Sequence, residues 1–241
     1  MYAPALIASV DLVSAAPLRE MRAFYHDLLG MPAVQATDGR LTIRAGASRI
    51  TFAPSGPGHS HPFYHFAFNI PANKLLAAYH WQKERTPLLP IPPALRDPRF
   101  PPEVVNYSHW NAHSIFFFDP AGNVVEYIAR HDLRNAADGE FGPSDLLCVS
   151  EIALVVDDVL ATAATLESTF GLPPYRGRDE HFAAVGDEHG LLLVMKRGRV
   201  ISFDAPERKA VSVFPTSVGV RRPKPARYAT PGFPYVVSAE A

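Results

Sequence analysis

Glu126 is the residue of this 241-residue chain whose position most strongly indicates chemistry. It lies in the middle of an apolar run, residues 124–128, whose β-branched and aromatic side chains are typical of a strand. Burying an unpaired carboxylate is costly, so a carboxylate in such a strand needs a partner. A metal ion or a fixed cation would supply that partner.

Two histidines stand shortly before this strand, in the sequence Tyr-Ser-His-Trp-Asn-Ala-His at 107–113. Because imidazole titrates near neutral pH, His109 and His113 are candidates for moving protons beside a metal. The alternatives are a loop ring that pairs with backbone carbonyls for His109 and a buried, hydrogen-bonded ring for His113. Trp110 and the run at 116–118 would provide apolar walls suited to an aromatic or otherwise flat substrate.

The strand that carries Glu126 belongs to a repeated pattern. Its turn, residues 119–123, contains Pro120, which presets φ, and Gly122, which tolerates positive φ. An apolar strand, an amphipathic helix and a hairpin occur three times. The strand–helix pairs are 6–13 with 17–29, 64–70 with 72–85 and 150–156 with 158–170, and the hairpins are 41–52, 113–129 and 182–196. A single unit of this kind exposes an apolar sheet face and is expected to pair with another.

The pattern therefore predicts an α+β fold in which repeated βαβββ units form cupped mixed sheets, followed by an irregular C-terminal tail. We expect paired units over 4–130, a third unit over 147–197 and a proline-rich C-terminal segment over 198–241. In this division the first and second units close one cup, and the C-terminal segment contains no complete fourth unit.

The composition bounds the class of protein. Hydrophobic residues make up 47% and charged residues 20%, which is ordinary for a globular protein, and a net charge of −1 gives no electrostatic footprint for nucleic acid. Cys148 is the only cysteine, which excludes a disulfide framework and a thiolate zinc site. The sequence contains neither a stretch of transmembrane length nor the basic start of a signal peptide. We expect a cytoplasmic protein with a small-molecule substrate and no membrane or nucleic-acid partner.

Three motifs make the chain resemble the vicinal oxygen chelate superfamily, which includes glyoxalases, bleomycin-resistance proteins and extradiol dioxygenases. They are Phe-Tyr-His-Asp-Leu-Leu-Gly-Met-Pro at 24–32, His-Phe-Ala-Phe at 65–68 and Phe-Asp-Pro-Ala-Gly-Asn-Val-Val-Glu at 118–126. The similarity spans residues 4–197. It implies paired βαβββ units that surround a divalent metal, with ligands from the first strands of units and from the glutamate of a closing strand.

By that resemblance His65 and Glu126 are metal ligands of the second unit. Imidazole with carboxylate suits Fe(II), which we favour, and Mn(II), Zn(II) or Ni(II) are alternatives. Asp11, on the first strand of the first unit, is our predicted third ligand; its alternatives are a turn cap or an ion pair with arginine. Glu151 holds the corresponding position of the third unit. The closing strand of this unit, residues 191–196, has no carboxylate, so we expect no second metal site there and a hydrogen bond from the C-terminal segment to Glu151.

The spacing from His109 through Phe116 and the turn to Glu126 resembles the signature of extradiol dioxygenases, although tyrosine usually stands where this chain has Phe116. The resemblance implies a ring-cleaving dioxygenase that acts on a small catechol-like substrate, with His109 and His113 as catalytic residues. A glyoxalase-like lyase or isomerase and a non-catalytic, resistance-type binding protein are the alternatives. We favour a homodimer, since symmetric pairs are the commonest oligomers.

Overall fold

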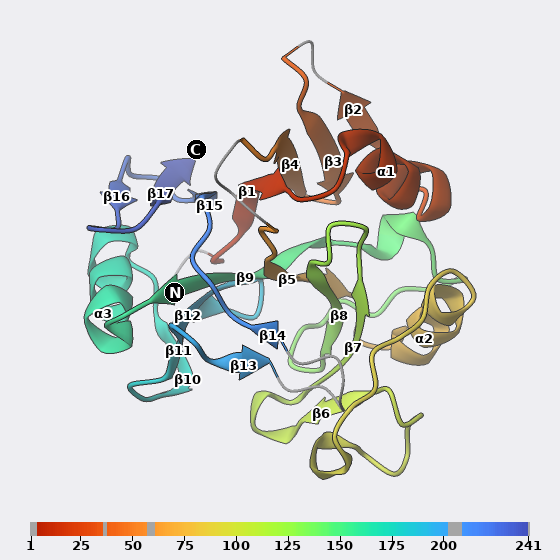
Figure 1. Ribbon diagram of the computed structural model, residues 1–241. Coiled ribbons are helices and arrows are strands. Elements are labelled where there is room, and N and C mark those ends of the chain that lie inside the picture. Colours follow the sequence, from red (N-terminus) through yellow and green to blue (C-terminus); the bar gives the residue numbers. More distant parts are fainter. Residues whose placement is uncertain (1–3, 36–37, 57–60, 202–208, 241) are drawn as a thin grey trace.

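The computed structural model describes residues 4–35, 38–56, 61–201 and 209–240 (Figure 1). The first unit contains β1 (Ile7–Ser14), α1 (Leu18–Arg22), its π-helical continuation η1 (Ala23–Leu28), β2 (Ala33–Gln35), β3 (Leu41–Ala45) and β4 (Ser48–Pro54). The second contains β5 (His65–Ile70), α2 (Leu75–Lys83), η2 (Pro93–Leu95), β6 (Val105–Tyr107), η3 (Ser108–Trp110), β7 (Ala112–Phe118) and β8 (Val124–Arg130).

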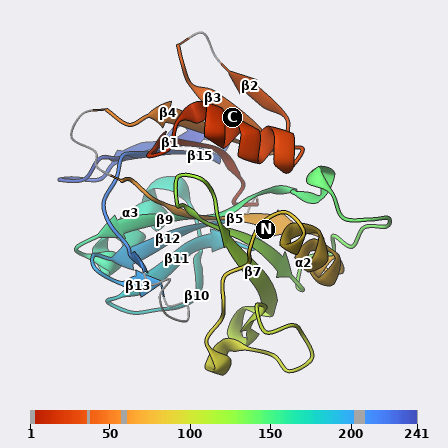
Figure 2. The same ribbon diagram turned by 45° about the vertical axis from the view of Figure 1, so that its right-hand side comes forward.

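The short helix η4 (Pro143–Asp145) leads into the third unit. This unit contains β9 (Cys148–Val156), α3 (Val159–Phe170), β10 (Pro174–Arg178), β11 (Phe182–Asp187) and β12 (Gly190–Lys196). The strands β13 (Val200–Ile201), β14 (Lys209–Ala210), β15 (Thr216–Arg221), β16 (Arg227–Ala229) and β17 (Tyr235–Glu240) follow. The prediction of an α+β fold with cupped mixed sheets is confirmed, and the helices lie at the periphery of the sheet (Figures 1 and 2).

Each complete unit closes in the same way, because its first strand runs parallel to its last. These pairs are β1 with β4, β5 with β8 and β9 with β12. The C-terminal segment repeats the arrangement without a helix, since β15 lies parallel to β17 and β16 pairs antiparallel with β17. It is thus more regular than a tail and forms a reduced fourth unit.

The pairing between units corrects our expectation. The second and third units join through antiparallel β5 and β9, and the first unit joins the C-terminal segment through antiparallel β1 and β15. The physical reason lies in the sheet edges: each first strand has one edge occupied by its own last strand and a second edge free. β9 occupies the free edge of β5, while β15 occupies that of β1. The first and second units therefore do not close one cup together.

Strand alternation divides the side chains of each unit between two faces. Phe66 and Phe68 of β5 point into the main core, which also contains Met21 and Leu166 from the helices. Ala67 belongs to a second apolar cluster on the opposite, concave face of the sheet. Odd positions of β5 and even positions of β8 consequently share the concave face. In β9 the same face carries residues 151, 153 and 155, because a shift in register beside Glu151 places Val149 in the main core.

The turn between β7 and β8 is fixed by Asp119. One oxygen of its buried carboxylate accepts hydrogen bonds from the backbone N–H groups of Ala121 and Asn123, and the other accepts one from the Asn123 side chain. The Tyr25 hydroxyl, from the first unit, donates to Asp119 at 2.8 Å. Two motifs noted in the sequence therefore meet in the core, and both support the hairpin that carries Glu126.

Helix α3 begins and ends at the residues that its sequence indicates. The Asp158 side chain accepts a hydrogen bond from the Ala161 N–H at 3.0 Å, and Gly171 ends the helix with φ 61°. Among the described residues, no helix is both long and apolar enough to cross a membrane.

Candidate metal centre

Three buried side chains from three adjacent strands converge on the concave face. They are His65 of β5, Glu126 of β8 and Glu151 of β9, and one ligand atom from each lies within 4.8 Å of the others. The register explains the meeting, because Ala67 of β5 lies opposite Glu126 on one side and Glu151 on the other. The small side chain of Ala67 leaves the space between the two carboxylates open.

The orientation of His65 indicates that the group needs a cation. Its Nδ1 lies 3.1 Å from the Val124 carbonyl oxygen, so this nitrogen is the one that carries a proton and donates. Its Nε2 then faces Glu126 Oε2 at 3.4 Å and Glu151 Oε2 at 3.9 Å. A neutral imidazole would place a lone pair against two carboxylates, and a proton or a metal ion at Nε2 relieves that repulsion.

The distances from His65 Nε2 to the oxygens of Glu126 and Glu151 both fit a shared ion. Ligand atoms that each lie about 2.1 Å from a metal are separated by at most about 4.2 Å. In addition, Glu126 Oε1 is buried without a hydrogen-bond partner, which is unusual for a carboxylate oxygen. The residues present therefore fit a divalent metal, with one imidazole and two carboxylates as donors.

Electrostatics within the group agree with this geometry. Burial, followed by the negative charge of Glu126, raises the pKa of Glu151 to about 7. Burial lowers the pKa of His65, but the contact with Glu126 and the charges of both carboxylates outweigh it, so the pKa is raised overall. Without a metal, the group would hold protons in place of the missing positive charge.

Arg130 fixes one oxygen of Glu151. Its guanidinium is fully buried, and Nη2 donates to Glu151 Oε1, while Oε2 of the same carboxylate faces His65. The Arg130 Nε donates to Ser150 Oγ at 3.2 Å, and Nη1 donates to the Tyr175 hydroxyl at 3.4 Å. Arg130 thereby selects the Glu151 oxygen that is left for a metal.

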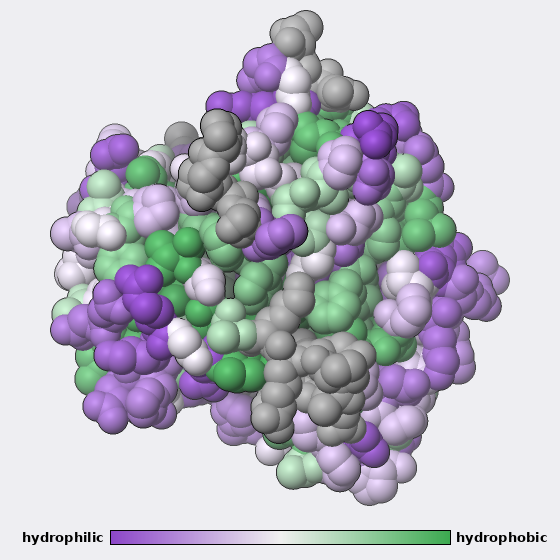
Figure 3. All heavy atoms as spheres, in the orientation of Figure 1, coloured by the Kyte–Doolittle hydropathy of each residue, from purple (hydrophilic) through white to green (hydrophobic). Residues whose placement is uncertain are grey.

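A cavity of about 500 Å³ opens beside the group. Its lining includes His65 and Glu151, aromatic and aliphatic walls, and part of the proline-dense stretch at 86–107. The lining residues are His65, Ile91, Ala94, Leu95, Val105, Asn106, Tyr107, Ser108, His109, Trp110, Phe116, Glu151, Phe182, Leu193, Met195, Arg199, Val200 and Ile201. On the face shown in Figure 3, apolar side chains gather toward the middle and polar ones lie mainly at the periphery. A cavity of this size and lining suits a small, flat substrate.

The structure brings together only part of the predicted site. His65 and Glu126 meet as expected, whereas Asp11 is exposed on β1 and lines a separate pocket of about 190 Å³ between β1, β4 and β15. β1 reaches β9 only at Ile7, opposite Val149, whereas Asp11 lies opposite Ser217 of β15 and therefore outside the group around His65. Glu151 of β9 occupies the place that we gave to Asp11, and it accepts its hydrogen bond from Arg130 rather than from the C-terminal segment.

The two predicted catalytic histidines lie in different surroundings. His109 lines the cavity. The His113 ring is held elsewhere, with Nε2 at 3.3 Å from Asp97 Oδ2 and Nδ1 at 2.8 Å from His131 Nε2. His113 is not among the residues that line the cavity, and its contacts match the buried, hydrogen-bonded role considered as the alternative.

Sequence reasoning missed Arg130 and Tyr107. Tyr107 lines the cavity together with His65 and Glu151, and its pKa is raised by burial and then by the negative charges of Glu126 and Glu151. The signal for Arg130 was present, since a charged residue two strand intervals after Glu126 shares the face of Glu126. Tyr107 carried no such signal because the path of the 86–107 stretch was not predictable.

The cup formed by the first unit and the C-terminal segment has a different centre. There Glu240, the last residue of β17, accepts hydrogen bonds from Ser9 and from the Arg49 guanidinium, at 3.1 Å for Arg49 Nη2 to Oε1. A protein cation thus neutralises the carboxylate in this cup. Within the described part of the chain, only the His65, Glu126 and Glu151 group gathers three side chains that could hold a metal.

Comparisons with known proteins identify the fold. No protein-family model matches the sequence, and no curated protein matches it. Among solved structures, a proposed dioxygenase from Bacillus subtilis is 14% identical with a TM-score of 0.61, covering 99% of this chain and 86% of the other. Glyoxalase I from Zea mays is also 14% identical, with a TM-score of 0.58 and coverage of 97% and 91%. At this identity the likeness shows the fold alone, and it is the fold that the resemblance to the vicinal oxygen chelate superfamily implied.

Proposed function

We propose that this protein is a metal-dependent enzyme whose substrate chelates the metal through two adjacent oxygen atoms, and that it acts as an extradiol-type ring-cleaving dioxygenase on a small catechol-like compound. The observation that carries the proposal is the buried His65, Glu126 and Glu151 group at the wall of an aromatic cavity. Three protein donors leave coordination positions open for a substrate, which is the arrangement that catalysis needs.

In this proposal the residues around the cavity have distinct roles. His65, Glu126 and Glu151 would hold the metal, with Fe(II) favoured, and the metal when bound would supply charge for the substrate oxygens and a site for dioxygen. Arg130 would keep Glu151 in place, and Phe116 and Trp110 would flank the ring of the substrate. His109 and Tyr107, both in the cavity lining, are the candidates for holding or moving a proton at a substrate oxygen.

Three measurements test this function. Protein purified without oxygen should contain about one divalent metal per chain, and oxygen consumption should start when a catechol is added. His65→Ala should lose both the metal and turnover, whereas His80→Ala, on an exposed position of α2, should keep both. Full turnover by metal-free His65→Ala protein would overturn the proposal.

A glyoxalase-like lyase or isomerase is the second candidate, and the donor set favours keeping it. Oxygenases that use ferrous iron commonly bind it with two imidazoles and one carboxylate, whereas this group has one imidazole and two carboxylates. A lyase or isomerase would convert its substrate without consuming oxygen. Turnover of a glutathione hemithioacetal, with no oxygen uptake on any catechol, would favour this candidate over the dioxygenase. Binding of a flat aromatic ligand without metal and without turnover would instead indicate a resistance-type binding protein.

A further inference from the structure

The mouth of the cavity beside the metal group carries a positive charge. Arg199 lines the cavity and is exposed, whereas His65 and Glu151 line it and are buried. Arg199 therefore lies at the entrance and the metal group at the floor. A ligand that spans the cavity would meet a metal at one end and a guanidinium at the other.

Within the described residues, the Arg199 guanidinium has no ion-pair partner. Its carbon lies 5.2 Å from the centre of the Phe182 ring, so the guanidinium contacts an aromatic side chain of the same cavity. Arg199 is the last of several causes that lower the pKa of Asp179, after the backbone hydrogen bonds that this carboxylate accepts from the N–H groups of His181 and Phe182. The charge of Arg199 is thus available to a ligand.

No acidic residue offsets this charge inside the described part of the cavity lining. Glu151 is the only carboxylate that lines it, and Glu151 is engaged by Arg130 and by the metal group. The remaining polar groups near the entrance include the side chains of Ser108 and His109, which can donate hydrogen bonds. The entrance therefore suits a ligand group that is negatively charged and accepts hydrogen bonds.

We propose that the natural substrate is an organic acid: a flat ring with two adjacent oxygen atoms at one end and a carboxylate on a short side chain at the other, with the carboxylate bound by Arg199. This substrate class rests on the proposed function, which places the adjacent oxygens at the metal group. A single planar guanidinium matches a carboxylate with two parallel hydrogen bonds. The apolar walls between the two ends, which include Trp110 and Leu193, suit a ring rather than a second polar group.

Calorimetric titration of the Mn(II)-loaded protein tests the inference with three ligands that differ only at the end of the side chain. These are 3-(3,4-dihydroxyphenyl)propanoic acid, its primary amide and the amine with a side chain of the same length, and the acid with one carbon fewer is included to vary the reach. The acid of better length should bind about tenfold more tightly than the amide, and the amine should bind most weakly, since a charge-assisted pair replaces a neutral contact. Raising the salt concentration should reduce the difference.

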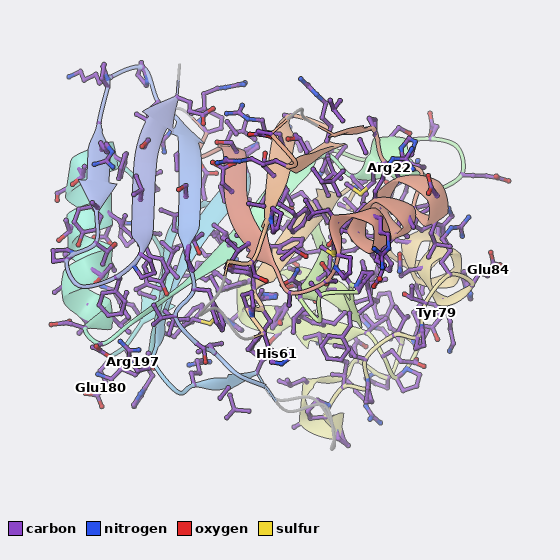
Figure 4. All side chains as sticks on the ribbon, turned by 45° about the horizontal axis from the view of Figure 1, so that its top comes forward. Arg22, His61, Tyr79, Glu84, Glu180 and Arg197 are labelled. Carbon is purple, nitrogen blue, oxygen red and sulfur yellow. The ribbon has the colours of Figure 1, made fainter. Side chains whose placement is uncertain are left out.

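Arg199→Gln should remove the preference for the acid and leave the affinity of the amide within about twofold, since only the charge is lost. The matched control is Arg197→Gln, because Arg197 is also exposed but pairs with Asp157 at 2.7 Å and lies at the edge of the molecule (Figure 4). Equal binding of acid and amide by the wild-type protein would overturn the inference and leave the proposed function standing. Binding of none of the ligands would overturn both, and an equal loss for all ligands in Arg199→Gln would overturn the role of Arg199.

Discussion

The metal-free protein should lose stability as the pH rises. Burial and the charge of Glu126 raise the pKa of Glu151 from 4.5 to about 7 in the folded protein, and the pKa of His65 is raised as well. Between pH 4.5 and about pH 7 the folded state therefore binds more protons than the unfolded state. By linkage, the stability from both groups is complete below the unfolded pKa and is lost as the pH rises through the folded one.

The magnitude follows from the pKa of Glu151. At about 1.4 kcal/mol per pH unit, a carboxyl group whose pKa rises from 4.5 to about 7 costs the metal-free folded state about 3 kcal/mol by pH 8. In a chain of this size each kcal/mol changes Tm by about 2–4 °C, so Tm should fall by about 6–12 °C. The window from pH 5 to 8 avoids interference from exposed aspartates such as Asp132 and Asp157, whose pKa values are lowered by their arginine partners and which titrate below it.

Thermal unfolding followed by circular dichroism, at pH 5 and pH 8, is the assay. In chelator Tm should fall between the two pH values, and with Mn(II) the fall should be smaller or reversed, because a bound ion holds both carboxylates without protons. Glu126→Gln removes the second cause of the raised pKa of Glu151, so its metal-free Tm should fall less. A metal-free Tm that stays level or rises from pH 5 to pH 8, with no response to Mn(II) at pH 8, would refute the reasoning.

Three further substitutions test the structure around the group. Arg130→Met leaves the buried Glu151 carboxylate without its guanidinium and should lower the free energy of unfolding, measured in urea, by about 3–5 kcal/mol. The control Arg176→Gln breaks an exposed pair and should lower it by less than about 1 kcal/mol. Equal losses in the two variants would contradict a buried ion pair. Ala67→Leu should fill the space between the two carboxylates, so elemental analysis should find no bound metal. The larger side chain should also lower the free energy of unfolding by about 1–3 kcal/mol. Metal retained by this variant would show that the ion lies elsewhere. Asp158→Ala should remove the cap of α3 and lower stability by about 1 kcal/mol without changing metal content, so a loss of metal would reveal an unexpected link to the site.

Much of the local structure was predictable because its causes are local. The turn after β7 depends on Asp119 and its own neighbours, and the end of α3 depends on Gly171. The strand that carries Glu126 was evident from its apolar composition, and the carboxylate within it indicated a site. His65 and Glu126 belong to one unit, in which β5 and β8 lie parallel, so a resemblance to a family of such units was enough to pair them.

The partner of each unit was not predictable in the same way. All three complete units expose an edge of their first strand, and composition does not say which edges meet. β15 occupies the free edge of β1, with β17 beyond it, and β9 occupies that of β5. That choice moved Asp11 away from the site and brought Glu151 into it.

The amino-acid sequence by itself determined the α+β units, the hairpin and the pair of candidate residues, His65 and Glu126, that one unit contains, because strand alternation and turn chemistry act over a few residues. Only the tertiary structure decided that Glu151 completes the group, that Arg130 holds it and that Arg199 stands at the entrance of the cavity. Each of these depends on edges and loops that meet across long stretches of chain, where the outcome is set by the packing of all the units together.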